Sequence, residues 1–111
     1  MLTAELLILQ FALPSDGLWP FAVLLLDPRA DRLYVRGRAD FGPVDPKDAR
    51  ILKLLLVQIS QEADEASGSE ILAHLEDVLS NSVRISERRR VYTSNIARSL
   101  EELADRELRT T

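Results

Sequence analysis

Two apolar stretches near the N-terminus decide the fold: residues 6–13 read LLILQFAL and residues 21–26 read FAVLLL. Successive side chains of an extended strand point to opposite sides of a sheet, so a strand with one face in water alternates between apolar and polar residues. Neither stretch alternates in this way. The sequence therefore predicts two strands that are apolar on both faces, and each face of their sheet needs a cover.

Water is not an acceptable cover for the second face. Leaving about five large side chains exposed would forgo roughly 2 kcal/mol each, on the order of 10 kcal/mol in all. A typical domain has about that much net stability. The cover is therefore either a helix from the C-terminal part of the same chain or a second subunit.

The predicted C-terminal helix carries a narrow stripe of three large apolar residues, Ile96, Leu100 and Leu103. Such a stripe is expected to cover one or two strands and not a four-stranded sheet, so the sequence favours a homodimer or a complex with another protein. The residues predicted to form this interface are Leu7, Leu9, Phe11, Phe21, Val23 and Leu25.

The segments around the two stretches predict an antiparallel meander. Residues 14–17, PSDG, favour a turn in which Gly17 takes a positive φ. Residues 27–31 turn the chain again, and residues 32–38 then alternate between apolar and polar side chains, which is typical of a half-solvated strand. Three strands joined by two short turns form a meander over residues 4–38.

Helical patterns follow the meander. Asp45 is a favourable N-cap and Pro46 suits the first helical position. Gly68 is predicted to end this helix, while Ser67 and Glu70 have the capping-box spacing that starts another.

A short strand near residues 83–92 and a last helix starting near residues 93–95 complete the order βββααβα. The predicted fold class is α+β, with an antiparallel sheet of three to four strands (the meander plus one later strand) packed with three helices.

Composition limits the class of protein. With 111 residues, 46% of them apolar and 29% charged, the chain is expected to form a single domain over residues 1–111. It has no cysteine, which excludes disulfides, thiolate zinc sites and a cysteine nucleophile. The apolar start lacks a basic residue before Arg29, and no apolar run approaches the roughly 20 residues that span a bilayer. We therefore expect a cytoplasmic protein without a membrane segment.

Motifs for catalysis or cofactor binding are absent from the sequence. The single histidine, His74, is interpreted as a structural or surface residue, and without a second histidine or a cysteine a transition-metal site is not predicted. The four glycines are too scattered for a phosphate-binding loop, and no serine lies in a GxSxG motif. We predict no catalytic residue, no metal and no cofactor.

Arginine provides the remaining functional signal, since twelve of the fourteen basic residues are arginine. A basic sheet face with an aromatic residue could bind an anion or single-stranded nucleic acid. The net charge of −4 and the presence of a single interleaved aromatic make nucleic acid an unfavoured partner. The candidate anion-binding residues are Arg32, Tyr34, Arg36, Arg38 and Arg84.

Three functional hypotheses follow, in order of preference. The first is a non-catalytic interaction or structural module that self-associates through an apolar sheet face. The second is a binder of anions or single-stranded nucleic acid that uses the arginine face. The third is a cofactor-free enzyme.

Overall fold

The structure is a computed structural model that describes residues 1–14, 17–78 and 82–108. The described elements form a mixed α+β fold in the predicted order βββααβα, with the late strand divided into two short strands, β4 and β5. Their bounds are β1 Leu2–Leu13, β2 Gly17–Asp27, β3 Arg32–Gly37, α1 Pro46–Glu65, α2 Gly68–Val78, β4 Val83–Ile85, β5 Arg89–Thr93 and α3 Ile96–Glu107.

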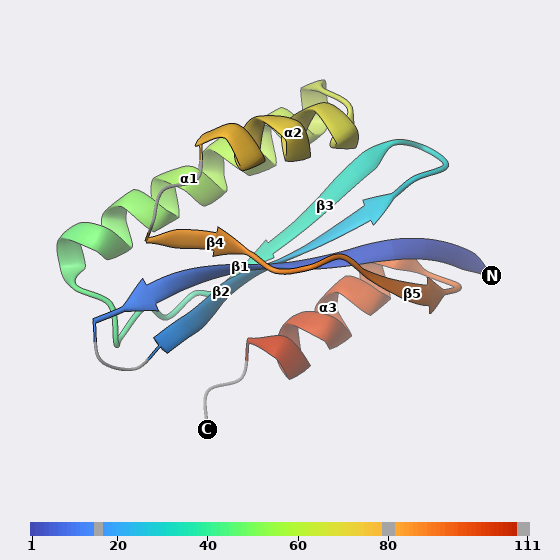
Figure 1. Cartoon of the computed structure of the whole chain (residues 1–111). Helices are drawn as coiled ribbons and strands as arrows, with labels where there is room; N and C mark the ends of the chain where they lie inside the picture. The colour runs from blue at the N-terminus through green and yellow to red at the C-terminus, as the bar shows by residue number, and fades with distance from the viewer. Residues whose placement is uncertain (15–16, 79–81, 109–111) are drawn as a thin grey trace.

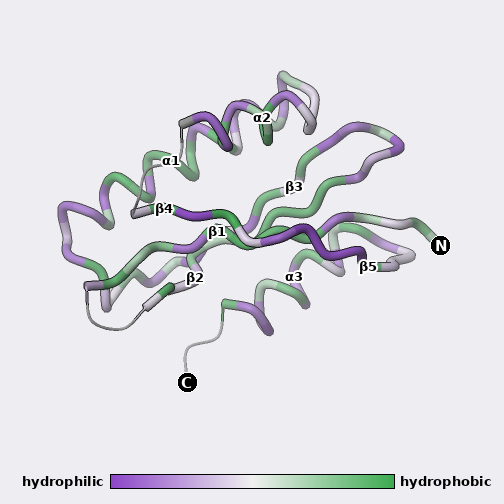
Figure 2. The backbone as a smooth tube through the Cα atoms, in the orientation of Figure 1, coloured by the Kyte–Doolittle hydropathy of each residue, from purple (hydrophilic) through white to green (hydrophobic). Residues whose placement is uncertain are grey.

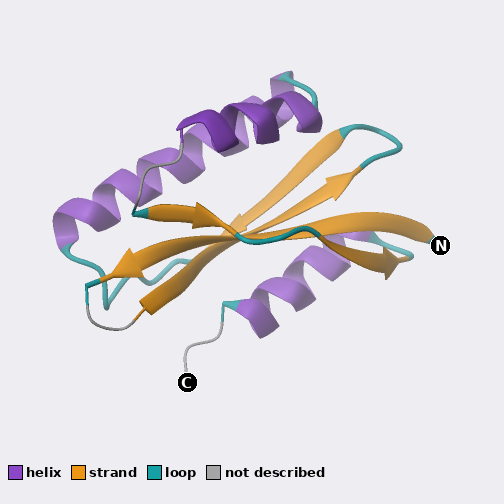
Figure 3. Cartoon of the chain, in the orientation of Figure 1, coloured by secondary structure: helices purple, strands orange, loops and turns teal. Residues whose placement is uncertain are grey.

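The strands form one antiparallel sheet with the order β3-β2-β1-β4, and β5 also pairs with β1. The sheet has five strands where three to four were predicted, because the segment after α2 forms two short strands along the same edge of β1. Helices α1 and α2 lie on one side of the sheet and α3 lies on the other (Figures 1 and 3). The fold is thus three layers deep, with β1 and β2 at its centre.

The first turn agrees with its prediction at Gly17, which has a φ of 75°. Residues 15 and 16 of that turn lie outside the described residues. The helix capping also agrees in part: the Asp45 side chain accepts a hydrogen bond from Lys47 N, and Ser67 Oγ accepts one from Glu70 N. Gly68, however, is the first residue of α2 and does not end α1, which has an extended cap at Ala66.

A register shift between β1 and β2 determines which face of the sheet Phe21 occupies. Leu9 is paired with Ala22 and Gln10 with Pro20, so Phe21 is the extra residue of a bulge. Plain alternation would put Phe21 on the same face as Val23 and Leu25. The bulge turns it to the opposite face, where its ring centroid lies 6.4 Å from that of Phe41.

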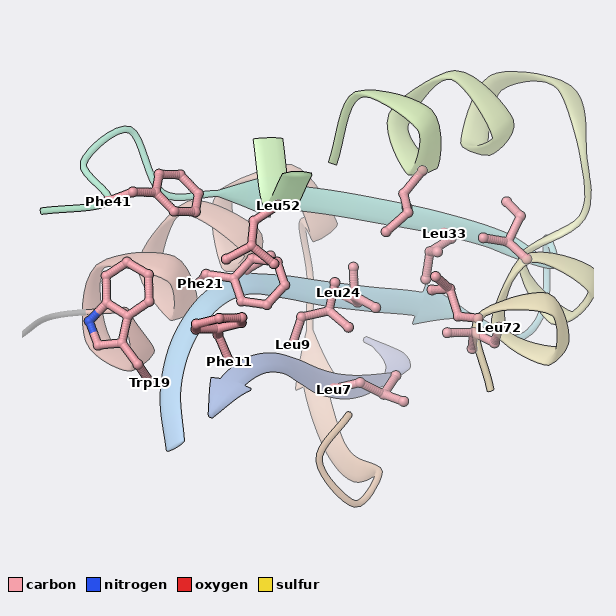
Figure 4. Packing of buried hydrophobic residues seen from close by; sticks show 14 of the residues in the cluster. Leu7, Leu9, Phe11, Trp19, Phe21, Leu24, Leu33, Phe41, Leu52 and Leu72 are labelled. Carbon is pink, nitrogen blue, oxygen red and sulfur yellow. The ribbon is translucent and has the colours of Figure 1, made fainter. Parts of the chain in front are cut away.

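The core between the sheet and α1–α2 is the larger of two apolar clusters (Figure 4). Aromatic rings gather at one end of it, where Trp19 meets Phe41 edge-on at 5.6 Å between centroids. Leucines from the sheet and both helices fill the rest, including Leu24, Leu52 and Leu72.

The second core lies between the sheet and α3, on the face for which the sequence favoured a second subunit. Strand β1 supplies three buried residues, β2 supplies two, and the rest come from α3 and its C-cap; the whole cluster consists of Ala4, Leu6, Ile8, Val23, Leu25, Ile96, Leu100, Leu103, Ala104 and Leu108. In Figure 2 the hydrophobic stretches of β1 and β2 run between the two helical layers. The chain's own C-terminal helix is therefore the cover.

The turn between β2 and β3 is tied to the start of α2 by Asp31, whose φ is 50°. Its Oδ1 accepts hydrogen bonds from Ser69 N at 2.9 Å and from Ser69 Oγ at 2.7 Å. These bonds favour the ionised carboxylate, and the one from the Ser69 side chain is the main cause of a lowered pKa of Asp31.

This link predicts a specific response to acid. Because the pKa of Asp31 is lower in the folded chain, its contribution to stability is fully present above the unfolded pKa of about 3.9 and is lost as the pH falls through the folded value. We expect Ser69→Ala to move the pKa of Asp31 back towards the unfolded value. A carboxyl ¹³C NMR titration measures this, and an unchanged pKa in the variant contradicts the assignment.

Candidate functional site

The six predicted interface residues do not form one surface. Paired residues of neighbouring strands share a face, and Leu7 pairs with Leu24 whereas Ile8 pairs with Val23. Residues facing α1 and α2 are Leu7, Leu9, Phe11 and Phe21, and those facing α3 are Val23 and Leu25. All six are buried within the single chain, so the sheet face offers a second subunit nothing to contact at these positions.

Helix α3 suffices as a cover for two reasons. It buries Ala104 and the C-capping Leu108 in addition to the three large residues of the predicted stripe. The area to be covered is also small, because β3 places polar side chains such as Arg36 on this face and β4 places Arg84 there. The stripe was correctly expected to cover one or two strands, and it covers β1 and β2, the two strands that are apolar on both faces.

Three of the five candidate anion-binding residues do lie together on the α3 side of β3. The guanidinium of Arg32 lies 5.8 Å from the centre of the Tyr34 ring, and Arg36 forms an ion pair with Glu101 of α3 at 3.4 Å. Both members of that pair are more than half exposed, so the pair contributes little to stability.

Arg38 has a different environment, just beyond the end of β3. Its guanidinium lies 4.5 Å from the centre of the Trp19 ring, and its Nη1 donates a hydrogen bond to the carbonyl oxygen of Leu108. Burial lowers the pKa of Arg38, and the Asp40 carboxylate raises it in part. Its Nε and the Nε1 of Trp19 are buried without a hydrogen-bond partner among the described residues. Arg38 thus links the end of β3 to the C-cap of α3 through this hydrogen bond.

Arg84 is separated from the others by the width of the sheet. It lies on β4 opposite Gln10 of β1, while β3 is the strand at the other edge. Three strand spacings of about 4.8 Å put roughly 14 Å between the two edges. The predicted arginine face is therefore a cluster on β3 with Arg84 apart from it, and its binding of anions stays a prediction.

The described part of the chain has neither a cluster of metal-ligating side chains nor a helix that could span a membrane. His74 is exposed on α2, in line with its interpretation as a surface residue. No cluster of three or more His, Cys, Asp or Glu side chains among residues 1–14, 17–78 and 82–108 could hold a metal ion. None of the described helices is long and apolar enough to cross a membrane.

Three of the large apolar residues that reach the surface lie together on the outer side of α1, whereas Met1, Leu18 and Tyr92 are exposed singly elsewhere. Ile51, Leu54 and Val57 are 63%, 63% and 54% exposed. They follow one another at intervals of three residues, so their side chains are neighbours along one row of the helix. We call these three residues the α1 ridge.

Sequence reasoning missed the α1 ridge, although a signal was present. Residues 51–57 read ILKLLLV, six apolar residues out of seven, which is more than the core-facing side of one helix can use. We considered an excess of apolar residues only in the strands. Helix α1 also has more apolar residues than its core-facing side buries, and Ile51, Leu54 and Val57 are exposed.

Most charges of α1 are separated along its length. The basic residues Lys47, Arg50 and Lys53 lie in its first half together with one acidic residue, Asp48, and the acidic residues Glu62, Asp64 and Glu65 lie in its last turn. No ion pair found among the described residues involves α1, whereas arginines elsewhere pair with carboxylates. Apart from Asp48, this order is the reverse of the one that the helix dipole favours.

Comparisons with known proteins give no relative. No protein-family model matches the chain, and neither a curated protein nor a solved structure matches it significantly.

Proposed function

We propose that this protein is a non-catalytic, cytoplasmic interaction module that self-associates through the α1 ridge. The observation that carries the proposal is the row of Ile51, Leu54 and Val57, exposed by more than half on the longest helix. A row of adjacent branched apolar side chains is a typical contact surface, whereas single exposed leucines need no explanation. The ridge takes the place of the sheet face from which self-association was first predicted.

The charges of α1 support a second copy as the partner. Two α1 helices that pack antiparallel, with a two-fold axis passing between Leu54 and Val57, place position 47 of one copy opposite position 64 of the other. The basic half of each helix then faces the acidic half of the second copy. A parallel arrangement would place like charges together, so the proposed dimer is antiparallel and isologous.

The size of the α1 ridge sets the strength of the dimer. Burying a Leu, Ile or Val side chain completely is worth about 1.5–3 kcal/mol, and the exposed fractions of three residues on each copy recover on the order of 6–10 kcal/mol. Association itself costs an estimated 4–15 kcal/mol. The gain and the cost are of similar size, so the proposed dimer is weak, and a dissociation constant below about 1 mM is the result that supports the proposal.

Leu54→Glu tests the α1 ridge. The substitution places a carboxylate at the centre of the contact on both copies, and we expect the dissociation constant to rise by at least about 100-fold. Sedimentation equilibrium over a dilution series from about 5 μM to 1 mM measures the dimer of the unchanged chain and its loss in the variant.

Tyr92→Glu is the matched control, because Tyr92 is 66% exposed but lies on β5 at the other edge of the sheet. We expect this variant to dimerise like the unchanged chain. A chain that remains monomeric up to 1 mM refutes the proposal, and so does a dimer that Leu54→Glu leaves intact.

A further inference from the structure

The outer edge of β3 has backbone groups for which no partner is found in the described part of the chain. Among the described strands, β3 pairs with β2 alone. The N–H of Arg38 donates to Phe21 O of β2 at 2.9 Å, so by the two-residue alternation of a strand the N–H of Arg36 also faces β2. The N–H and C=O groups of Val35 and Gly37 consequently point away from the sheet.

Part of this edge is closed by α2. A Cβ atom placed on Gly68 would lie 3.1 Å from backbone atoms of Arg32 and of Leu33, so the start of α2 lies against the first residues of β3. Towards the end of β3, a Cβ atom placed on Gly37 would meet the Leu56 side chain of α1, which lies on one face of the strand. We call residues 34–37 the open edge, since no strand on their outer side is described.

A groove lies on each side of the open edge. The groove on the α3 side has a volume of about 490 Å³ and is lined by Arg36, Arg38 and Leu108, with Asp40 and Asp105. The groove on the α1 side also has a volume of about 490 Å³. Its lining includes Lys53, Leu56, Val57, Ser60, Gln61 and Asp64.

The two grooves differ in chemistry, and the difference follows the alternation of the strand. Arg32, Tyr34 and Arg36 project to the α3 side, whereas Val35 packs against the apolar cluster on the α1 side. A strand laid beside residues 34–37 would therefore have arginines near every second side chain and apolar neighbours near the others.

The arginines also decide which strand fits. In an antiparallel pairing of β3 with β3 of a second copy, a two-fold axis at Tyr34 would put Arg32 of each chain opposite Arg36 of the other, and like charges in such positions are destabilising. A glutamate or aspartate opposite Tyr34 would instead lie diagonal to both arginines.

We infer that the open edge binds an extended segment of another protein by strand addition, with acidic and apolar residues alternating in that segment. The Val35 and Gly37 backbone groups supply the hydrogen bonds of the added strand. Its acidic side chains lie on the α3 side, opposite Tyr34 and Arg36, and its apolar side chains lie over Leu56. This inference does not depend on self-association through the α1 ridge.

The acidic side chains of the segment compete with Glu101 for Arg36. Arg36 contacts Glu101 and Arg38 contacts Leu108, so α3 and β3 run in the same direction and Asp105 lies near residue 38. We therefore place the acidic residues of the segment beside residues 34–36, away from Asp40 and Asp105. If the ion pair between Arg36 and Glu101 is removed, Arg36 is free to contact the acidic residues of the segment, and the segment binds more tightly.

A capped seven-residue peptide that alternates valine and glutamate is the probe for this site. Fluorescence anisotropy measures its binding, and amide hydrogen exchange followed by NMR measures the protection of Val35 and Gly37. We expect saturable binding with slower exchange at these two amides. A peptide of alternating valine and lysine is expected not to bind, and N-methylation of the backbone groups that face β3 is expected to abolish binding.

Variants of the chain test the position of the peptide. Arg36→Glu is expected to weaken binding about tenfold or more, while Arg84→Glu, at the opposite edge of the sheet, leaves it unchanged. Glu101→Gln is expected to tighten binding about two- to threefold, and Glu102→Gln on the same helix leaves it unchanged. Leu54→Glu, which removes the α1 ridge contact, leaves peptide binding intact and separates this inference from the proposed function.

Three results would overturn the inference. The first is no binding of the valine–glutamate peptide at 1 mM, a concentration on the order of the dissociation constant of a weak complex. The second is equal binding of the lysine peptide, which removes the acidic specificity. The third is binding without protection of Val35 and Gly37, which reduces the effect to general attraction between charges.

Discussion

The substitution Leu25→Asp is expected to unfold the protein at 25 °C. Leu25 is 0% exposed and lies between β2 and α3 in the second core. The change removes about 1.5–3 kcal/mol of burial free energy and leaves a carboxyl group without a partner in an apolar environment, which costs several kcal/mol more. Together these losses reach the 5–15 kcal/mol by which a domain is typically stable. Far-UV circular dichroism and urea titration measure the loss.

Leu25→Met is the control for this prediction. It conserves volume and chemistry and is expected to cost less than about 1.5 kcal/mol. The experiment also separates the two covers that the sequence left open. If a second subunit covered this face, Leu25→Asp would yield a folded monomer, and that result would contradict the packing of α3.

The substitution Phe21→Ala is expected to cost about 3–5 kcal/mol, because it removes a fully buried ring from the aromatic end of the larger core. For a chain of this length the melting temperature should fall by on the order of 10–25 °C. Thermal unfolding followed by circular dichroism measures the shift, and Phe21→Leu serves as a milder control.

The position of Phe21 at a bulge gives this prediction a second readout. The ring lies beside Phe41, so a double-mutant cycle between Phe21→Ala and Phe41→Ala is expected to give a coupling of about 0.5–1.5 kcal/mol. A ring facing α3 instead would show no coupling to Phe41. A coupling near zero therefore refutes the bulged register.

Local residue chemistry was sufficient to predict most elements of the fold, but not the division of the late strand into β4 and β5. Gly17 and Asp45 act as predicted because a turn with positive φ and a helix N-cap depend on a few adjacent residues. Gly68 was misinterpreted for a related reason. A glycine after a helix usually ends it, but this one is needed where α2 lies against the backbone of Arg32 and Leu33.

The candidate sites were harder to predict from the sequence than the elements of the fold. The clustering of Arg32, Tyr34 and Arg36 followed from alternation within one strand, but the separation of Arg84 depends on strand order. Strand order is set by which apolar surfaces pack together across the whole chain, and no local pattern encodes it. The α1 ridge was missed because the exposed apolar residues of a helix can be identified only when its core-facing side is known.

By itself the sequence determined that β1 and β2 are apolar on both faces and that each face must be covered, because hydrophobic free energy depends on composition and on the two-residue period of a strand. Only the tertiary structure decided what covers the second face. Helix α3 suffices there because the flanking strands present polar side chains, and the surfaces on which we propose partners are therefore on α1 and along the edge of β3. The reason is that burial is a property of the packed chain, whereas apolarity is a property of its residues.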